Sequence, residues 1–103
     1  MPSIPAPGRG RLVLVVEDEA LIALHLEFIL KRHGWRVLGP AASVAQALRL
    51  LDENELPDVA VLDVNLQGEP VVPVASALAS VPNVGKPIDE RRLLTALAQA
   101  VER

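Results

Sequence analysis

The chain has 103 residues, of which 50% are hydrophobic and 22% charged, and its net charge is −3. These values are typical of one globular domain and argue against a disordered chain, while the slight acidic excess removes the electrostatic case for direct binding of DNA or RNA. Because the sequence has no cysteine and only two histidines, His25 and His33, it excludes a disulfide scaffold, a cysteine nucleophile and a multi-histidine zinc site.

The first ten residues differ in composition from the rest of the chain. They include three prolines and two glycines and lack the apolar centre of a secretory signal. We therefore expect a flexible leader over residues 1–10 and a single domain over residues 11–103. No apolar run reaches the roughly 18 residues that a membrane-spanning helix needs. The sequence thus predicts a cytoplasmic protein with no membrane segment and no nucleic-acid partner.

The first predicted strand covers Arg11–Val16. Its five consecutive aliphatic residues are typical of a parallel strand that is buried on both faces. An acidic run, Glu17–Glu19, separates it from a helix predicted to begin at Ala20 and to end before Gly34, a glycine suited to a left-handed cap. The apolar positions of this helix form a wide stripe and predict close packing; they are Leu21, Leu24 and Phe28, with Ile22, Leu26 and Ile29 beside them.

The middle of the chain predicts a second strand, a second helix and a third strand. The second strand covers Trp35–Leu38 and is closed by Gly39 and Pro40. The second helix covers Ser43–Asp52, and the spacing of Ser43 and Gln46 indicates a capping box at its start. Its apolar face consists of Val44, Ala47, Leu48 and Leu51. The third strand covers Asp58–Leu62 and is continuously apolar over its last four residues.

The C-terminal part is less regular. A loop is expected over Val64–Pro70, followed by a helix from about Pro73 to Ala79 and a short strand over Val81–Gly85. The last helix is predicted from Asp89, a good N-cap, to about Val101, and Leu93, Leu94, Leu97 and Val101 supply its buried face. This alternation predicts an α/β fold: a doubly wound parallel sheet of about four strands, with four helices distributed over both faces.

Charged residues follow three of the predicted strands. Glu17 and Asp18 follow the first strand, Asp63 follows the third and Lys86 follows the last. In open α/β sheets ligands bind outside the carboxyl ends of the strands, so the acids converge if the first and third strands are neighbours. Clustered carboxylates favour a hard cation such as Mg²⁺, and a lysine suits a phosphoryl oxygen. An aspartate between them can attack phosphorus and form an aspartyl phosphate.

Three sequence blocks resemble the signature blocks of bacterial response-regulator receiver domains. They are V-L-V-V-E-D-E, V-A-V-L-D-V-N-L-Q-G and G-K-P-I, and Asp18 and Asp63 lie 45 positions apart. Two segments, G-P-A-A-S-V-A-Q-A-L and D-V-N-L-Q-G-E-P, are similar to those of single-domain receivers that partner HWE-type sensor histidine kinases. The resemblance implies a flavodoxin-like (CheY-like) receiver fold and a histidine kinase as partner.

The resemblance also implies a role for each matching residue. Asp63 matches the phosphoacceptor, and Lys86 matches the lysine that contacts the acceptor and the phosphoryl group. Asp18 and Asp63 match ligands of Mg²⁺, and Glu17 matches the acid that reaches the metal through water. Asn65 matches the position whose backbone carbonyl binds the metal.

The interval from Asp63 to Lys86 departs from the family, because 23 positions separate them, about half the usual number. The fourth strand, its terminal switch hydroxyl and the following helix have no match, and Ser76 and Ser80 are the nearest hydroxyls. Either the domain is truly shortened between residues 79 and 86, or the printed sequence leaves out a segment there. In a shortened domain the last strand can lie beside the third; otherwise the third strand keeps an open edge, which invites a homodimer.

Three functions fit these observations. The first is a receiver, not an enzyme, that takes a phosphoryl group from a histidine kinase onto Asp63 with Mg²⁺ and acts by protein contact or as a phosphate sink. The second is a pseudo-receiver that keeps the fold as an interaction module without the switch. The third is a Mg²⁺-dependent phosphatase of the aspartyl-phosphate class, which Asn65 disfavours because these enzymes carry a second acid two positions after the nucleophile.

Overall fold

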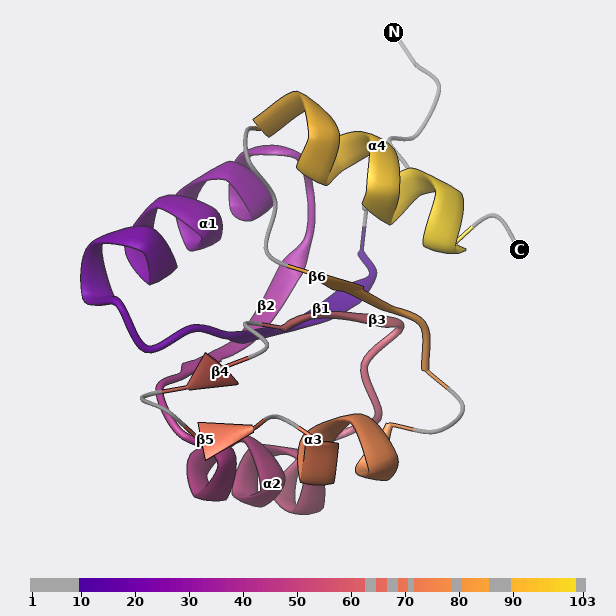
Figure 1. The fold of residues 1–103 in the computed structure, drawn as a ribbon. Helices are drawn as coiled ribbons and strands as arrows, with labels where there is room; N and C mark the ends of the chain where they lie inside the picture. The colour runs from indigo at the N-terminus through magenta and orange to yellow at the C-terminus, as the bar shows by residue number, and fades with distance from the viewer. Residues whose placement is uncertain are drawn as a thin grey trace, which may run out of the picture.

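The fold is built around a four-stranded parallel sheet. In the computed structural model the described residues are 10–62, 65–66, 69–70, 72–78, 81–85 and 90–101. The sheet has the order β2-β1-β3-β6 and consists of β1 (Leu12–Val16), β2 (Arg36–Ala41), β3 (Val59–Leu62) and β6 (Asn83–Gly85). The helices are α1 (Ala20–Arg32), α2 (Val44–Glu53), α3 (Val72–Ala77) and α4 (Glu90–Val101). Helices α1 and α4 cover one face of the sheet, and α2 and α3 cover the other (Figure 1). The predicted α/β fold is confirmed.

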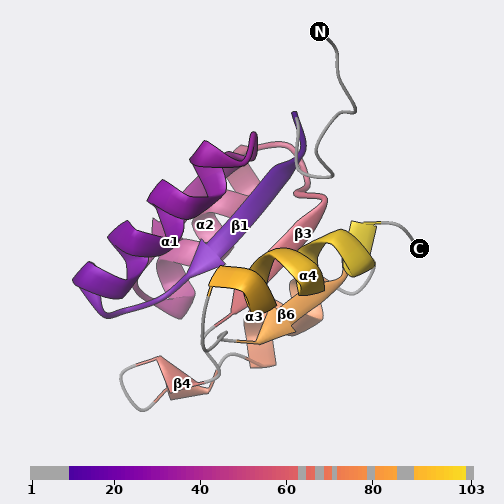
Figure 2. The same ribbon diagram turned by 90° about the horizontal axis from the view of Figure 1, so that it is seen from above.

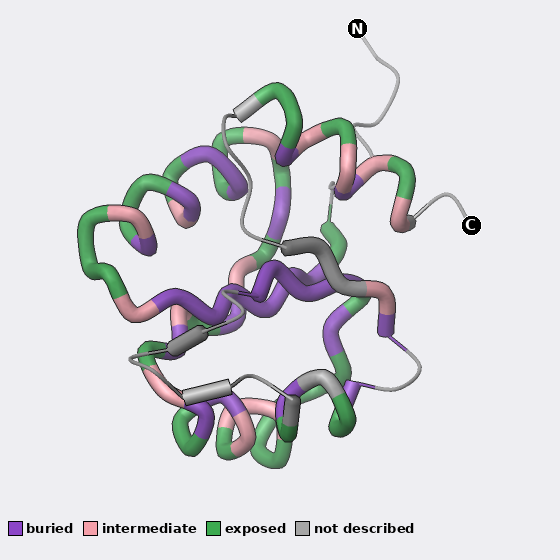
Figure 3. The backbone as a smooth tube through the Cα atoms, in the orientation of Figure 1, coloured by how far each residue is buried: buried purple, intermediate pink, exposed green. Residues whose placement is uncertain are grey.

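Strand β1 is the centre of the core. All five of its residues are buried, as the aliphatic run predicts. Side chains alternate across a strand, so Val13 and Val15 pack with α1 and α4, whereas Leu12, Leu14 and Val16 pack with α2 and α3. The burial pattern in Figure 3 follows this division, since β1 and β3 are buried along their whole length, β2 is buried only at Leu38 and Ala41, and α1 and α2 are buried only on their inner sides. One strand therefore joins two separate apolar clusters.

The last strand lies directly beside the third. Strand β6 pairs in parallel with β3, with Leu62 opposite Gly85. This is the arrangement expected for a shortened domain. The edge of β3 is occupied, so the alternative in which it stays open for a second chain does not apply.

The predicted packing of the first helix is confirmed for Leu26 and Ile29 and wrong for the central stripe. The buried side chains of α1 are Ala23, Leu26, Ile29 and Leu30. The stripe expected to pack is exposed, with Leu21 at 82%, Leu24 at 63% and Phe28 at 60% of its surface open to solvent. The helix is apolar on nearly every side, so its periodicity did not distinguish the inner face from the outer one.

Strand β2 is longer than predicted. It continues past Leu38 through Gly39 and Pro40 to Ala41, and its register with β1 shifts between Leu14 and Val16. Proline is tolerated here because β2 has only β1 as a neighbour in the described sheet.

Two local predictions concern segments on either side of β3. The predicted start of α2 is confirmed at its Ser43 N-cap, whose hydroxyl accepts a hydrogen bond from the Gln46 amide at 3.1 Å; the Gln46 side chain reaches back to the Ala42 amide at 2.9 Å, one position before the amide that a standard capping box uses. The loop expected over Val64–Pro70 is instead partly ordered as a small antiparallel pair, β4 (Asn65–Leu66) and β5 (Glu69–Pro70). Residues 1–9 of the expected leader lie outside the described residues.

Gly39 is a position where only glycine fits. Its φ is +99°, and an added Cβ atom would lie 2.8 Å from the backbone nitrogen of Ala41 and 3.0 Å from the carbonyl oxygen of Val15. We expect Gly39→Ala to lower the free energy of unfolding by about 2 kcal/mol, measured by urea denaturation. Gly10→Ala is the matched control, because Gly10 also has a positive φ (+75°) but its Cβ would meet nothing within 4 Å. An equal loss in both variants would contradict the steric argument.

Candidate functional site

The carboxyl ends of three strands are aligned across the sheet. Val16 at the end of β1 lies opposite Leu62 at the end of β3, which in turn lies opposite Gly85 at the end of β6. Neighbouring strands are about 4.8 Å apart, so these ends form one short row. Figure 2 shows the three strands side by side and ending toward the same edge. This alignment is the arrangement that the predicted site requires.

Glu17 occupies the first position beyond β1. Its side chain is buried, with 2% of its surface exposed, and is the only buried charged one in the described part of the chain. Its backbone amide donates a hydrogen bond to the Ala41 carbonyl at 2.9 Å, and its carboxylate accepts one from the Glu19 amide at 3.0 Å. The acid is therefore held in place from both its backbone and its side chain.

The next two acids differ from Glu17 in exposure. Asp18 is partly exposed, and Glu19 is exposed at the N-cap of α1, where its own side chain makes no capping hydrogen bond. The Glu17 carboxylate thus accepts a backbone N–H at the start of the helix, a position where a negative charge is favourable. Glu17 and Asp18 offer carboxylate oxygens of the kind that Mg²⁺ prefers, so this part of the site fits a hard cation.

The other predicted site residues are described only in part. Asp63 and Lys86 lie outside the described residues; in the sequence they directly follow Leu62 and Gly85. The backbone of Asn65 belongs to β4 and pairs with Pro70. Ser76 is exposed on α3, and Ser80 lies outside the described residues. Within the described ranges no three His, Asp or Glu side chains lie close enough together to hold a metal ion.

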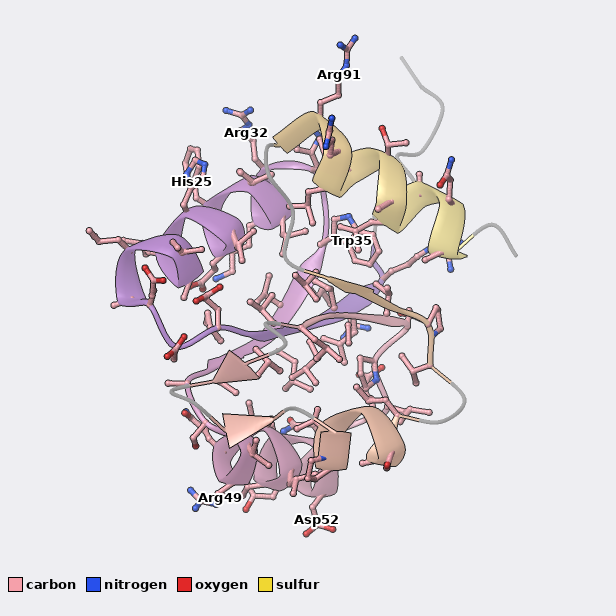
Figure 4. All side chains as sticks on the ribbon, in the orientation of Figure 1. His25, Arg32, Trp35, Arg49, Asp52 and Arg91 are labelled. Atoms are coloured by element: carbon pink, nitrogen blue, oxygen red, sulfur yellow. The ribbon has the colours of Figure 1, made fainter. Side chains whose placement is uncertain are left out.

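The two histidines and the tryptophan lie away from the acids at the strand ends. His25 is exposed on α1, and His33 is partly exposed at the end of that helix. Trp35 is 4% exposed and packs in the cluster between the sheet, α1 and α4 (Figure 4). None of them lies among the acids at the strand ends.

A curated relative is a transcriptional regulatory protein. The chain is 34% identical over 70 residues to the transcriptional regulatory protein PdtaR of Mycobacterium tuberculosis, a match that covers 68% of this chain and 34% of PdtaR. The chain thus spans about a third of the length of that relative. No protein-family model matches the chain.

Solved structures share the fold over most of the chain. The receiver (REC) domain of the Erythrobacter litoralis response regulator PhyR is 24% identical, has a TM-score of 0.79 and is covered to 92%, with 91% of this chain matched. SdrG of Sphingomonas melonis Fr1 is 33% identical, with a TM-score of 0.73 and coverage of 90% of this chain and 97% of SdrG. The chain belongs to the response-regulator receiver family. The resemblance noted in the sequence is confirmed.

Family membership sets general expectations for this receiver. Its relatives are response regulators, which are generally signalling proteins and not enzymes, and receiver domains generally bind Mg²⁺. In the part of the chain that the structure describes, no helix is long and apolar enough to cross a membrane.

The contact between Glu17 and Glu19 gives a stability prediction. Glu17→Gln keeps an oxygen that can accept the Glu19 amide, whereas Glu17→Ala leaves that amide without this acceptor. We expect Glu17→Ala to have a free energy of unfolding about 1–2 kcal/mol below that of Glu17→Gln, measured by urea denaturation. Both variants are uncharged at this position, so the comparison removes the effect of the lost charge. Equal stability would mean that the hydrogen bond does not support the helix.

Proposed function

We propose that the chain is a phosphoacceptor receiver in which Asp63 takes a phosphoryl group from a histidine kinase. The alignment of the ends of β1, β3 and β6 carries this proposal. Asp63 and Lys86 come directly after Leu62 and Gly85 in the sequence. We therefore infer that they lie at the ends of two neighbouring strands, at the same edge of the sheet as Glu17. An acceptor carboxylate, a metal-binding acid pair and a lysine would then share one small region.

The proposed transfer is a substitution at phosphorus. A carboxylate oxygen of Asp63 attacks the phosphorus of a phosphohistidine, a P–O bond forms, the P–N bond breaks, and the imidazole leaves. Mg²⁺, when bound, neutralises negative charge on the phosphoryl oxygens and the acids. Asp18, Asp63 and the backbone carbonyl of Asn65 would hold it directly, and Glu17 would do so through water.

Lys86 is proposed to hold the phosphoryl group in place. Its ammonium would supply a compact positive charge to a phosphoryl oxygen, at the end of the strand beside the acceptor. The direct pairing of β6 with β3 supports this role, because the residue after Gly85 starts one strand away from the residue after Leu62. The shortened interval would then leave the lysine within reach of the acceptor.

A pseudo-receiver is the second candidate, and the same short interval favours it. The interval from Asp63 to Lys86 is 23 positions and has no counterpart of the family's switch hydroxyl. Within this interval the described hydroxyl, that of Ser76, is exposed on α3. Such a protein would bind its partners equally well with and without a phosphodonor. A phosphatase has less support, since the relatives are regulators and Asn65 stands at the position of the second acid.

Several finer proposals accompany the receiver function. The kinase is proposed to be of the HWE class, because segments Gly39–Leu48 and Asp63–Pro70 are similar to those of single-domain receivers that partner HWE-type kinases. The receiver is proposed to act in the cytoplasm, by protein contact or as a phosphate sink.

Metal binding gives the first test of the site. We expect Mg²⁺ at about ten times its Kd to stabilise the wild-type protein by about 1.4 kcal/mol, seen as a rise in Tm of several degrees. Asp18→Asn removes a proposed ligand and should lose most of this rise, whereas Asp52→Asn, an exposed acid on α2, should keep it. An undiminished rise in Asp18→Asn would remove Asp18 from the metal site.

Phosphorylation is tested by intact-protein mass spectrometry after incubation with Mg²⁺ and acetyl phosphate. Wild type and Asp52→Asn should gain the mass of one phosphoryl group, and Asp63→Asn should gain none. A gain that persists in Asp63→Asn would rule out this acceptor. No gain in a folded wild-type protein that binds Mg²⁺ would favour the pseudo-receiver.

A further inference from the structure

The end of strand β2 holds the backbone of Glu17. The register between β1 and β2 shifts between Leu14 and Val16, where two steps along β1 correspond to three along β2. The extra residue in β2 forms a bulge, and bulges of this kind change the direction of a strand end beside a site. Here the Ala41 carbonyl faces the Glu17 amide, which donates a hydrogen bond to it at 2.9 Å. The position of Glu17 therefore depends on where β2 ends.

The residue that follows β2 is held by helix α2. Gln46, the third residue of α2, accepts a hydrogen bond from the Ala42 amide through its side-chain oxygen at 2.9 Å. Its own amide donates to the Ser43 hydroxyl at 3.1 Å. In a standard capping box the side chain at this position accepts the amide of the N-cap residue, which here is Ser43. The bond to Ala42 instead attaches the first turn of α2 to the residue directly after β2.

Three hydrogen bonds thus follow one another along the carboxyl edge of the sheet. The first is the bond between the Gln46 side chain and the Ala42 amide. The second joins the Ala41 carbonyl to the Glu17 amide, and the third joins the Glu17 carboxylate to the Glu19 amide at 3.0 Å. Figure 1 shows α2 and α1 on opposite faces of the sheet, so these bonds connect the starts of the two helices across its edge.

The burial of Glu17 makes its orientation sensitive to these contacts. Only 2% of its surface is exposed, so water does not readily replace a hydrogen bond that the protein loses there. Gln46, by contrast, is exposed, and its replacement leaves neither a cavity nor a buried polar group at its own position. An effect of that replacement on Glu17 therefore has to pass through the backbone of Ala41 and Ala42.

We propose that Gln46 is a positioning residue for Glu17. Its side chain holds Ala42, which keeps the preceding carbonyl in place for the Glu17 amide, and this backbone sets the direction of the Glu17 carboxylate. For Mg²⁺ the inference rests on the proposed function, in which Glu17 reaches the metal through water. Residues that orient a metal ligand change the affinity for the metal without touching it. Because Gln46 is exposed and acts through backbone bonds, we expect an effect of about three- to tenfold.

Amide hydrogen exchange, measured by NMR without metal, tests the positioning. Gln46→Leu keeps a helix-forming side chain but has no acceptor, whereas Gln46→Glu keeps an acceptor oxygen. The exchange rate of the Glu17 amide is divided by that of the Asp58 amide, which donates to the Leu12 carbonyl at 2.8 Å at the opposite end of β1. This ratio removes changes in overall stability. It should rise about three- to tenfold in Gln46→Leu and keep its wild-type value in Gln46→Glu.

A matched control and a metal titration complete the test. Gln99 is also exposed on a helix, α4, so Gln99→Leu should leave the exchange ratio unaltered. Titration with Mg²⁺, followed through the amide signals, then measures the Kd of each protein. We expect Gln46→Leu to raise the Kd about three- to tenfold, and Gln99→Leu to leave it unchanged. Gln46→Glu should bind Mg²⁺ at least as tightly as wild type, because it restores the acceptor and adds a negative charge.

Three results would overturn the inference. They are an unchanged exchange ratio in Gln46→Leu, a raised ratio that Gln46→Glu does not restore, and a raised ratio with unchanged Mg²⁺ affinity. The first would leave Gln46 as a cap of α2 alone. A wild-type protein that binds no Mg²⁺ would instead contradict the proposed metal site, and the exchange ratio, which needs no metal, would still decide whether Gln46 positions Glu17.

Discussion

Burial of β1 on both faces is the constraint on which the rest of the structure depends. Its five aliphatic side chains belong to two clusters, one under α1 and α4 and one under α2 and α3. A strand buried in this way needs a neighbour on each edge for its backbone hydrogen bonds, and β2 and β3 supply them. Because these strands are parallel, their carboxyl ends lie at the same edge of the sheet. Glu17 and Asp18 follow β1 at that edge.

The pairing of β6 with β3 shows how a short chain can keep this edge. The crossover through α3 returns the chain beside β3, so the sheet stays parallel with four strands. The aligned residues Val16, Leu62 and Gly85 then mark three neighbouring strand ends. The register of this four-stranded sheet thus keeps three strand ends at one edge although the interval between β3 and β6 is short.

The sequence predicted the strands and helix capping well, because those patterns are local. Continuous aliphatic runs identified β1 and β3, and the Ser43 and Gln46 spacing identified the start of α2. Three features depended on tertiary contacts and were missed: the outward side of α1, the extension of β2 through Pro40, and the β4–β5 pair. Of the predicted acids, Glu17 and Asp18 directly follow β1 as the sequence indicates, and the roles of the site residues stay predictions.

Helix α1 extends from the acidic edge of the sheet and carries an exposed apolar stripe on its outer face. The backbone amide of its N-cap, Glu19, donates a hydrogen bond to the buried Glu17 carboxylate, and the inner side of the helix is fixed by Leu26, Ile29 and Leu30. Because the same helix carries the exposed stripe, a rigid contact links the acidic edge to that stripe through a single element. A change in charge at Glu17 or Asp18 would act first on the start of α1, where the helix dipole is most sensitive to negative charge. The exposed apolar stripe and the helix start that responds to charge at the acidic edge thus belong to one helix.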